Sequence, residues 1–137
     1  MRVAINGFGR IGRSVFRILN FRENLDVVAI NDIADNEAMA YLLKYDTVMG
    51  PFNDLVEIKG DVLSTSHNAV KMLAEKDPNQ LPWGKMGVDV VIESTGIFRT
   101  KNQLKVRFLL HFTLRKISEK LLKSLKSQVS KKSIFRP

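Results

Sequence analysis

Short apolar runs recur along the first hundred residues and predict buried strands. Residues 3–5, 25–30 and 88–92 are almost continuously apolar, which is typical of strands covered on both faces of a parallel sheet. Apolar residues alternate less regularly in residues 56–59 and 69–74, for which two shorter strands are predicted.

Apolar residues at helical spacing follow the first two runs. They predict a helix that begins near residue 11 and reaches residue 19, and a second helix over residues 37–45. Because strands and helices alternate, we expect an α/β fold with a doubly wound parallel sheet and the strand order 3-2-1-4. Phe16 and Phe21 are expected in its core, and Trp83 is expected to be a packing anchor.

A glycine-rich turn, GFGRIG at residues 7–12, lies between the first predicted strand and the first helix. In such a turn the first glycine permits the tight bend, the second lets the backbone approach a pyrophosphate, and the third lets the helix pack closely. The N-terminus of the helix then offers unpaired N–H groups to the anion. The spacing also occurs in ordinary turns, but its position between a buried strand and an amphipathic helix favours a dinucleotide site.

Asp32 ends the second predicted strand, 20 residues after Gly12. A carboxylate at this place can accept hydrogen bonds from the ribose hydroxyls of adenosine, and it repels the 2′-phosphate of NADP. The sequence therefore predicts binding of NAD in preference to NADP. The alternative is that Asp32 only caps the segment that follows it.

Ser94, Thr95 and Gly96 follow the apolar run at residues 88–92. In a doubly wound sheet the ligand lies between the carboxyl ends of the first and fourth strands, where two hydroxyls and a small residue suit the second ribose. Ordinary turn residues at a strand end are the alternative interpretation. No metal site is predicted, because His67 and His111 have no partner at metal-ligand spacing.

Five motifs follow one another in the first hundred residues: NGFGRIGR at 6–13, Asn31-Asp32, LLKYD at 42–46, EKDPNQLPW at 75–83 and ESTGIF at 93–98. In their order and spacing they resemble the glyceraldehyde-3-phosphate dehydrogenase family, in its NAD-binding N-terminal part. The resemblance covers residues 1 to about 104. It implies a partial Rossmann-type fold, NAD as the cofactor, and a place in the glycolytic oxidation of glyceraldehyde 3-phosphate, for which the full-length members of the family form homotetramers.

The resemblance also implies which residues form the cofactor site. Lys76 stands where the family often has arginine, so a planar guanidinium contact with adenine is replaced by an ammonium group. The implied cofactor-binding residues are Asn6, Gly7, Phe8, Gly9, Arg10, Ile11, Gly12, Asn31, Asp32, Lys76, Ser94, Thr95, Gly96 and Phe98.

The catalytic groups of the family do not carry over to this sequence. The 137 residues contain no cysteine, and the family's cysteine nucleophile, histidine base and phosphate-binding residues lie in a second domain. A hydroxyl nucleophile would need an adjacent base, and neither histidine is spaced to serve Ser94 or Thr95. We expect no dehydrogenase turnover from this chain alone, and modest NAD affinity.

The composition changes abruptly near residue 101. Residues 1–100 carry 11 Lys and Arg against 13 Asp and Glu, whereas residues 101–137 carry 11 against 1, so the net charge of +8 comes from the tail. We predict an incomplete NAD-binding domain over residues 1–104 and a basic tail, helical or disordered, over 105–137. One helical face of that tail would consist of Leu110, Leu114, Ile117, Leu121 and Leu125.

Two further interpretations stay open at this point. A basic amphipathic tail can bind nucleic acid or an anionic membrane surface, or it can cover the sheet. The abrupt change is also typical of out-of-frame translation, which would leave a nonfunctional fragment with residues 88–92 as an apolar sheet edge. No run of 18 apolar residues and no leader pattern occurs, so we predict a cytoplasmic location without a membrane span.

Overall fold

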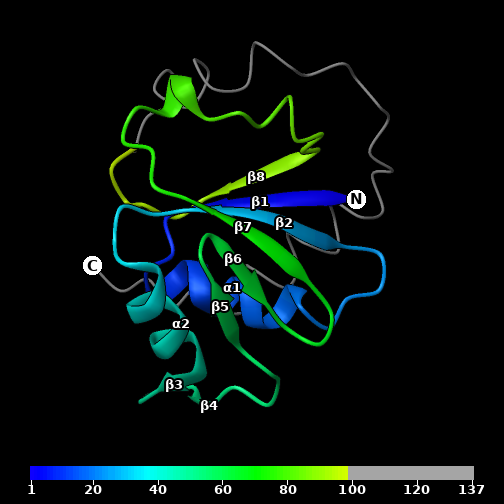
Figure 1. Cartoon of the computed structure of the whole chain (residues 1–137), viewed down its shortest axis with the longest axis vertical. Helices are drawn as coiled ribbons and strands as arrows, with labels where there is room; N and C mark the ends of the chain where they lie inside the picture. The colour runs from blue at the N-terminus through cyan, green and yellow to red at the C-terminus, as the bar shows by residue number, and fades with distance from the viewer. Residues whose placement is uncertain (99–137) are drawn as a thin grey trace, which may run out of the picture. The chain divides into compact units, whose positions relative to one another are not determined.

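The structure is a computed structural model, and it describes residues 1–98. Six strands form one sheet in the order β5-β6-β7-β2-β1-β8 (Figure 1). Its strands are β1 (Arg2–Asn6), β2 (Asp26–Asn31), β5 (Glu57–Lys59), β6 (Val62–Ser64), β7 (Ala69–Leu73) and β8 (Val90–Glu93). The other elements are the helices α1 (Arg10–Leu19) and α2 (Asn36–Lys44), the 3-10 turn η1 (Pro78–Gln80) and the small hairpin of β3 (Tyr45–Asp46) and β4 (Gly50–Pro51).

Four parallel strands make up one side of the sheet, with β8 at its edge. β1 pairs with β2 on one side and with β8 on the other, and β2 pairs with β7. Among the parallel strands this is the order 3-2-1-4, so the predicted α/β fold and its strand order are confirmed. The register places Asn6 beside both Asn31 and Glu93, and the carboxyl ends of three strands therefore meet at one edge.

Two antiparallel strands extend the sheet beyond β7. β5 pairs with β6 and β6 pairs with β7, and Gly60 turns the chain between β5 and β6 with a φ of +60°. Residues 56–59 were predicted as a strand, but β6 was not. Strand β6 has only three residues, of which Leu63 alone is fully buried, and this is too short for a periodic pattern in the sequence.

Helix α1 buries only some of its apolar side chains. Phe16 is fully buried and packs edge-on against Phe8, with ring centroids 5.7 Å apart, as predicted for a core residue. Ile11 and Ile18 are instead 60% and 41% exposed. Arg17 is buried on the inner face of α1. Its guanidinium can be buried there because it donates hydrogen bonds to backbone carbonyl oxygens of neighbouring segments.

The prediction that Phe21 lies in the core is wrong. Phe21 follows the end of α1 and is 51% exposed. Its ring contacts Phe52 and His67 at the surface, with centroid distances of 5.6 and 5.3 Å. An aromatic residue just past a helix end can therefore pack on one side only, which the residue type alone does not reveal.

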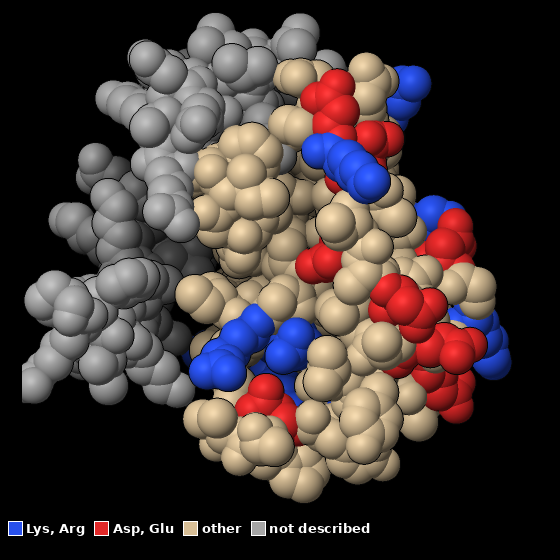
Figure 2. Space-filling view, turned by 90° about the vertical axis from the view of Figure 1, so that its left-hand side faces the viewer, with Lys and Arg blue, Asp and Glu red and all other residues tan. Residues whose placement is uncertain are grey.

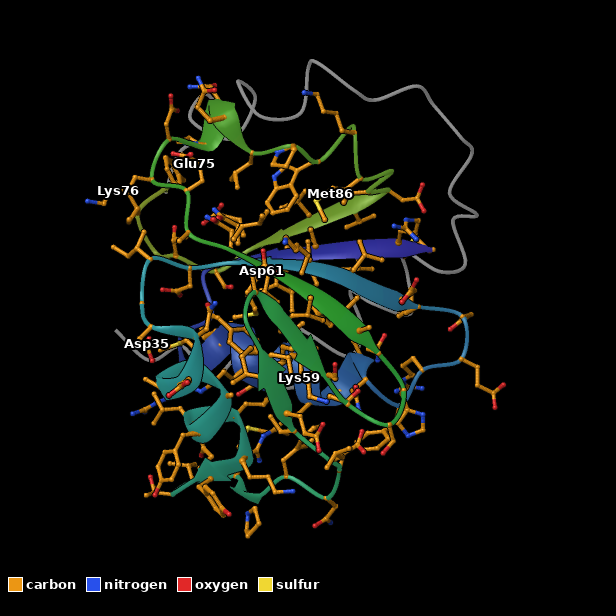
Figure 3. All side chains as sticks on the ribbon, viewed as in Figure 1. Asp35, Lys59, Asp61, Glu75, Lys76 and Met86 are labelled. Atoms are coloured by element: carbon orange, nitrogen blue, oxygen red, sulfur yellow. The ribbon has the colours of Figure 1, made fainter. Side chains whose placement is uncertain are left out.

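The two faces of the sheet are covered differently. Helices α1 and α2 lie on one side, and the long connection between β7 and β8, which contains η1, crosses the other (Figure 1). Trp83 and Met86 from this connection pack against Ala4, Val28 and Ala29 of β1 and β2, and Figure 3 shows Met86 above the strands. The prediction that Trp83 is a packing anchor is confirmed.

The remaining predictions on the chain's organisation concern its C-terminal part. The predicted helical face of the tail, with its possible nucleic-acid or membrane contacts, lies outside the described residues. Within residues 1–98, no helix is both long and apolar enough to span a membrane.

Candidate functional site

The glycine turn connects the end of β1 to the start of α1. Gly7 has a φ of +91°, which glycine adopts without strain. A Cβ at Gly7 would lie 2.6 Å from the backbone nitrogen of Thr95, and one at Gly12 would lie 2.1 Å from the carbonyl oxygen of Gly7. Both positions require glycine, because the turn packs directly against the end of β8 and against the first turn of α1.

Gly9 differs from the other two glycines of the motif. It is exposed, and a Cβ built on it meets no heavy atom within 4 Å. Gly9 is the N-cap of α1 and makes no side-chain capping hydrogen bond. The N-terminus of α1 therefore has no capping side chain from its N-cap residue, and the unpaired N–H groups of a helix N-terminus can bind an anion.

Asp32 connects the glycine turn with the end of β2. Its Oδ2 accepts a hydrogen bond from the N–H of Phe8 at 2.6 Å, and its Oδ1 accepts one from the N–H of Ala34 at 3.0 Å. The residue is half-buried, so the carboxylate keeps access to solvent beside the turn. The structure thus places a negative charge within one hydrogen bond of the motif, and it also shows the local capping that was the alternative interpretation.

The residues after β8 form the second side of the site. The hydroxyl of Ser94 donates to the carbonyl oxygen of Gly7 at 2.6 Å, and the N–H of Ser94 donates to the carbonyl oxygen of Asn6 at 2.8 Å. Ser94 thereby fixes the turn to the end of β8. Gly96 is exposed with a φ of +73°, and nothing lies within 4 Å of a Cβ built on it. Phe98 follows and is half-buried.

Asn6 and Asn31 lie inside the sheet rather than at its surface. They are 1% and 5% exposed, and the side-chain amide of Asn31 donates to Oδ1 of Asn6 at 2.7 Å. Asn31 also exchanges two hydrogen bonds with the backbone of Glu75. Lys76, the next residue, is exposed, and Figure 3 shows its side chain pointing away from the strands.

Arg13 supports the turn from within α1. Its Nη1 donates to the carbonyl oxygen of Phe8 at 3.0 Å.

The pKa of Asp46 is lowered by hydrogen bonds from the N–H groups of Met49 and Val48, and further by the charges of Arg17 and Arg13. Acidic and basic side chains both lie exposed at the side of the molecule that carries the carboxyl ends of the parallel strands (Figure 2).

Glu75 and Arg13 belong to this site but were not predicted as part of it. A polar residue at the end of an apolar run is the signal that could have indicated Glu75.

A hollow of about 400 Å³ lies elsewhere, at the amino ends of β2 and β7, and is lined in part by Asn20, His67 and Asn68. The amide of Asn68 donates to Oδ1 of Asn20 at 2.9 Å, and the amide of Asn20 donates to a neighbouring carboxylate at 2.6 Å, so both side chains are engaged with protein partners.

Comparison with known proteins identifies what this arrangement is similar to. Residues 1–101 match the family model described as glyceraldehyde 3-phosphate dehydrogenase, NAD binding domain. A glyceraldehyde-3-phosphate dehydrogenase of Borreliella burgdorferi is 49% identical over 111 residues, which is 81% of this chain and 33% of the relative. Those of Thermotoga maritima and Streptomyces avermitilis are 50% identical over 107 residues and 54% identical over 99 residues, or 77% and 72% of this chain.

The similarity is confined to one part of these relatives. The chain spans about a third of the length of the curated relatives it matches, 32% of the Thermotoga protein and 30% of the Streptomyces protein. The matched family model covers the glycine turn, Asp32 and the end of β8 together.

Proposed function

Because the chain belongs to the glyceraldehyde-3-phosphate dehydrogenase family through its NAD-binding domain, we propose that the carboxyl ends of β1, β2 and β8 form its NAD site. NAD is the cofactor of this domain. The observation that carries the proposed site is the turn at Gly7–Gly12, where two glycines are packed against backbone and Gly9 alone opens to solvent.

The fit of a dinucleotide to these residues follows from the chemistry of each part. The open N-terminus of α1 offers the N–H groups of Arg10 and Ile11 to a pyrophosphate. The Asp32 carboxylate accepts hydrogen bonds from the adenosine ribose, next to the turn that it already contacts. Lys76, Thr95, Gly96 and Phe98 are the further residues that we propose to surround the cofactor.

The proposed role of the residues in this chain is to bind and orient the cofactor. NAD, when bound, supplies the hydride acceptor for oxidation of an aldehyde. The 137 residues contain no cysteine, so we propose that the chemical step on glyceraldehyde 3-phosphate does not arise from this chain alone. The domain boundary near residue 104 and the homotetramer of the full-length family members rest on the resemblance, and the cytoplasmic location rests on the sequence pattern. All three stay predictions.

Replacing Gly9 by alanine tests the site directly. The native φ of −69° and ψ of −162° suit alanine, so we expect the free energy of unfolding to change by about 1 kcal/mol or less. The new methyl group would occupy the open space in front of α1, and NAD affinity should fall at least about tenfold because the pyrophosphate can no longer approach the backbone. Calorimetric titration of the folded chain with NAD measures the change.

Gly60→Ala is the matched control, since this glycine is also exposed with no atom within 4 Å of a Cβ, but lies in the turn between β5 and β6. Its positive φ makes the substitution mildly destabilising, and NAD affinity should stay within about twofold of the wild type. Equal affinity of the Gly9→Ala chain and the wild type for NAD would rule out the proposed approach of the pyrophosphate.

A further inference from the structure

A line of hydrogen bonds, made by four side chains and the backbone of Glu75, crosses the sheet behind the proposed NAD site. Asn6 lies at the end of β1 and Asn31 at the end of β2, and both are almost completely buried. Glu75 lies two residues after β7, and Glu93 is the last residue of β8. We call the five residues Glu75, Asn31, Asn6, Glu93 and Thr95 the amide network.

One half of the amide network holds the segment that contains Lys76. The Asn31 side chain accepts from the N–H of Glu75 at 2.8 Å and donates to the carbonyl oxygen of Glu75 at 3.0 Å. The carboxamide therefore imitates a peptide group and continues the pairing of β2 with β7 past its last backbone pair, Asn31 with Leu73. Residues 75 and 76 are thus fixed to the end of β2 by a side chain.

The other half holds the turn after β8. Asn6 donates through Nδ2 to Oε2 of Glu93 at 2.7 Å, and Oε1 of Glu93 accepts from the N–H of Thr95 at 3.0 Å and from its hydroxyl. Because Asn31 donates to Oδ1 of Asn6 at 2.7 Å, the two halves are joined. The network connects the ends of β7, β2, β1 and β8 in the order in which the strands pair.

The direction of every hydrogen bond in the network is determined. The carboxylate of Glu93 can only accept, so the Asn6 amide must present its NH₂ group there and its oxygen to Asn31. Turning the Asn6 amide would face NH₂ against NH₂ on one side and oxygen against carboxylate on the other. A buried network of this kind is costly to leave partly satisfied, which makes it sensitive to single substitutions.

We propose that Asn6 and Asn31 are positioning residues for NAD: they hold residues 75–76 and residues 94–96 at the spacing that the dinucleotide spans, and do not contact it through their side chains. This inference rests on the proposed NAD site. Both side chains are buried with their amides engaged inside the sheet, whereas Lys76, Thr95 and Gly96 are the groups that reach the surface or its edge.

A reciprocal exchange of donor and acceptor tests the network. Asn6→Asp places a carboxylate against that of Glu93, and Glu93→Gln places an NH₂ group against that of Asn6 or against the donors of Thr95. In the double variant the new amide at position 93 donates to the new carboxylate at position 6 and accepts from Thr95, and that carboxylate still accepts from Asn31. We expect NAD affinity to fall about tenfold in each single variant and to return within about threefold of the wild type in the double variant.

Asn68→Asp is the control at the opposite end of the sheet. Asn68 is 9% exposed and donates to Oδ1 of Asn20, so the substitution also places a carboxylate against a buried amide oxygen. It should lower the midpoint of thermal unfolding but leave NAD affinity within about twofold of the wild type. Titrations at a temperature where every variant is folded separate loss of positioning from loss of stability.

Each outcome decides the proposal. Single variants that bind NAD like the wild type, a double variant no better than the worse single, or an equal loss in Asn68→Asp would overturn it. If both single variants fail to fold, recovery of folding and NAD binding in the double variant supports the network, and an unfolded double variant overturns it. A wild-type chain that binds no NAD would refute the proposed function. The network itself would then be tested by the midpoints of thermal unfolding, which should fall in each single variant and recover in the double variant.

Discussion

Replacing Gly12 by alanine is expected to disrupt both the fold and the NAD site. The added Cβ would lie 2.1 Å from the carbonyl oxygen of Gly7 and 3.1 Å from Oγ of Ser94. The first of these atoms belongs to the backbone, so α1 must move away from the turn. We expect the free energy of unfolding to fall by about 3 kcal/mol, and NAD binding to be lost in any folded population. Urea unfolding followed by circular dichroism measures the first effect, and calorimetry the second.

Gly9→Ala is the internal comparison for this prediction, since it adds the same methyl group to the same turn with no atom within 4 Å. It should keep nearly the full stability and lose only NAD affinity. Equal stabilities of the Gly12→Ala and Gly9→Ala chains would contradict the close packing of α1 on the turn.

Replacing Asp32 by alanine is expected to remove the preference for NAD over NADP. The carboxylate offers charge-assisted acceptors to the ribose hydroxyls and repels a 2′-phosphate. Its loss should weaken NAD binding about tenfold to a hundredfold, leave NADP binding no weaker than before, and bring the two affinities to within about threefold. Parallel titrations with NAD and NADP at one salt concentration give the ratio.

Asp35→Ala provides the matched control. Asp35 lies three residues further along at the same end of the sheet (Figure 3), and it caps α2 by accepting from the N–H of Ala38 at 2.9 Å. Its loss should cost about 1 kcal/mol of stability. The ratio of NAD to NADP affinity should stay at the wild-type value. An unchanged ratio in Asp32→Ala, or a ratio lowered equally in Asp35→Ala, would remove Asp32 from its assigned role.

The sequence predicts the parts of this fold that repeat a local pattern. Continuous apolar runs predict β1, β2 and β8, and the spacing of the three glycines predicts the turn whose packing the structure shows. Asp32 is predicted because the motif specifies its distance from Gly12. The predictions of the strands and of the turn need only neighbouring residues, since strand period and glycine conformation are local properties.

The sequence does not predict features that depend on which strands are neighbours and in what register. Asn6 and Asn31 are polar residues at strand ends, and on the chain alone they fit a cofactor contact as well as a structural hydrogen bond. Their burial and their contact with each other follow from the pairing of β1 with β2. The exposure of Phe21 could not be predicted from the sequence either, because only the positions of Phe52 and His67 show that its ring packs at the surface.

The most direct test of the NAD site is the chemical shift of each backbone amide of the ¹⁵N-labelled chain, measured during titration with NAD. We predict the largest changes at the turn and at the ends of β2 and β8, in Gly9, Arg10, Ile11, Ala34, Thr95 and Gly96. The amides of Asn20, His67 and Asn68, at the amino ends of the strands, should not move. Shifts centred on those three residues, or no shifts in a folded chain at millimolar NAD, would contradict the proposed site.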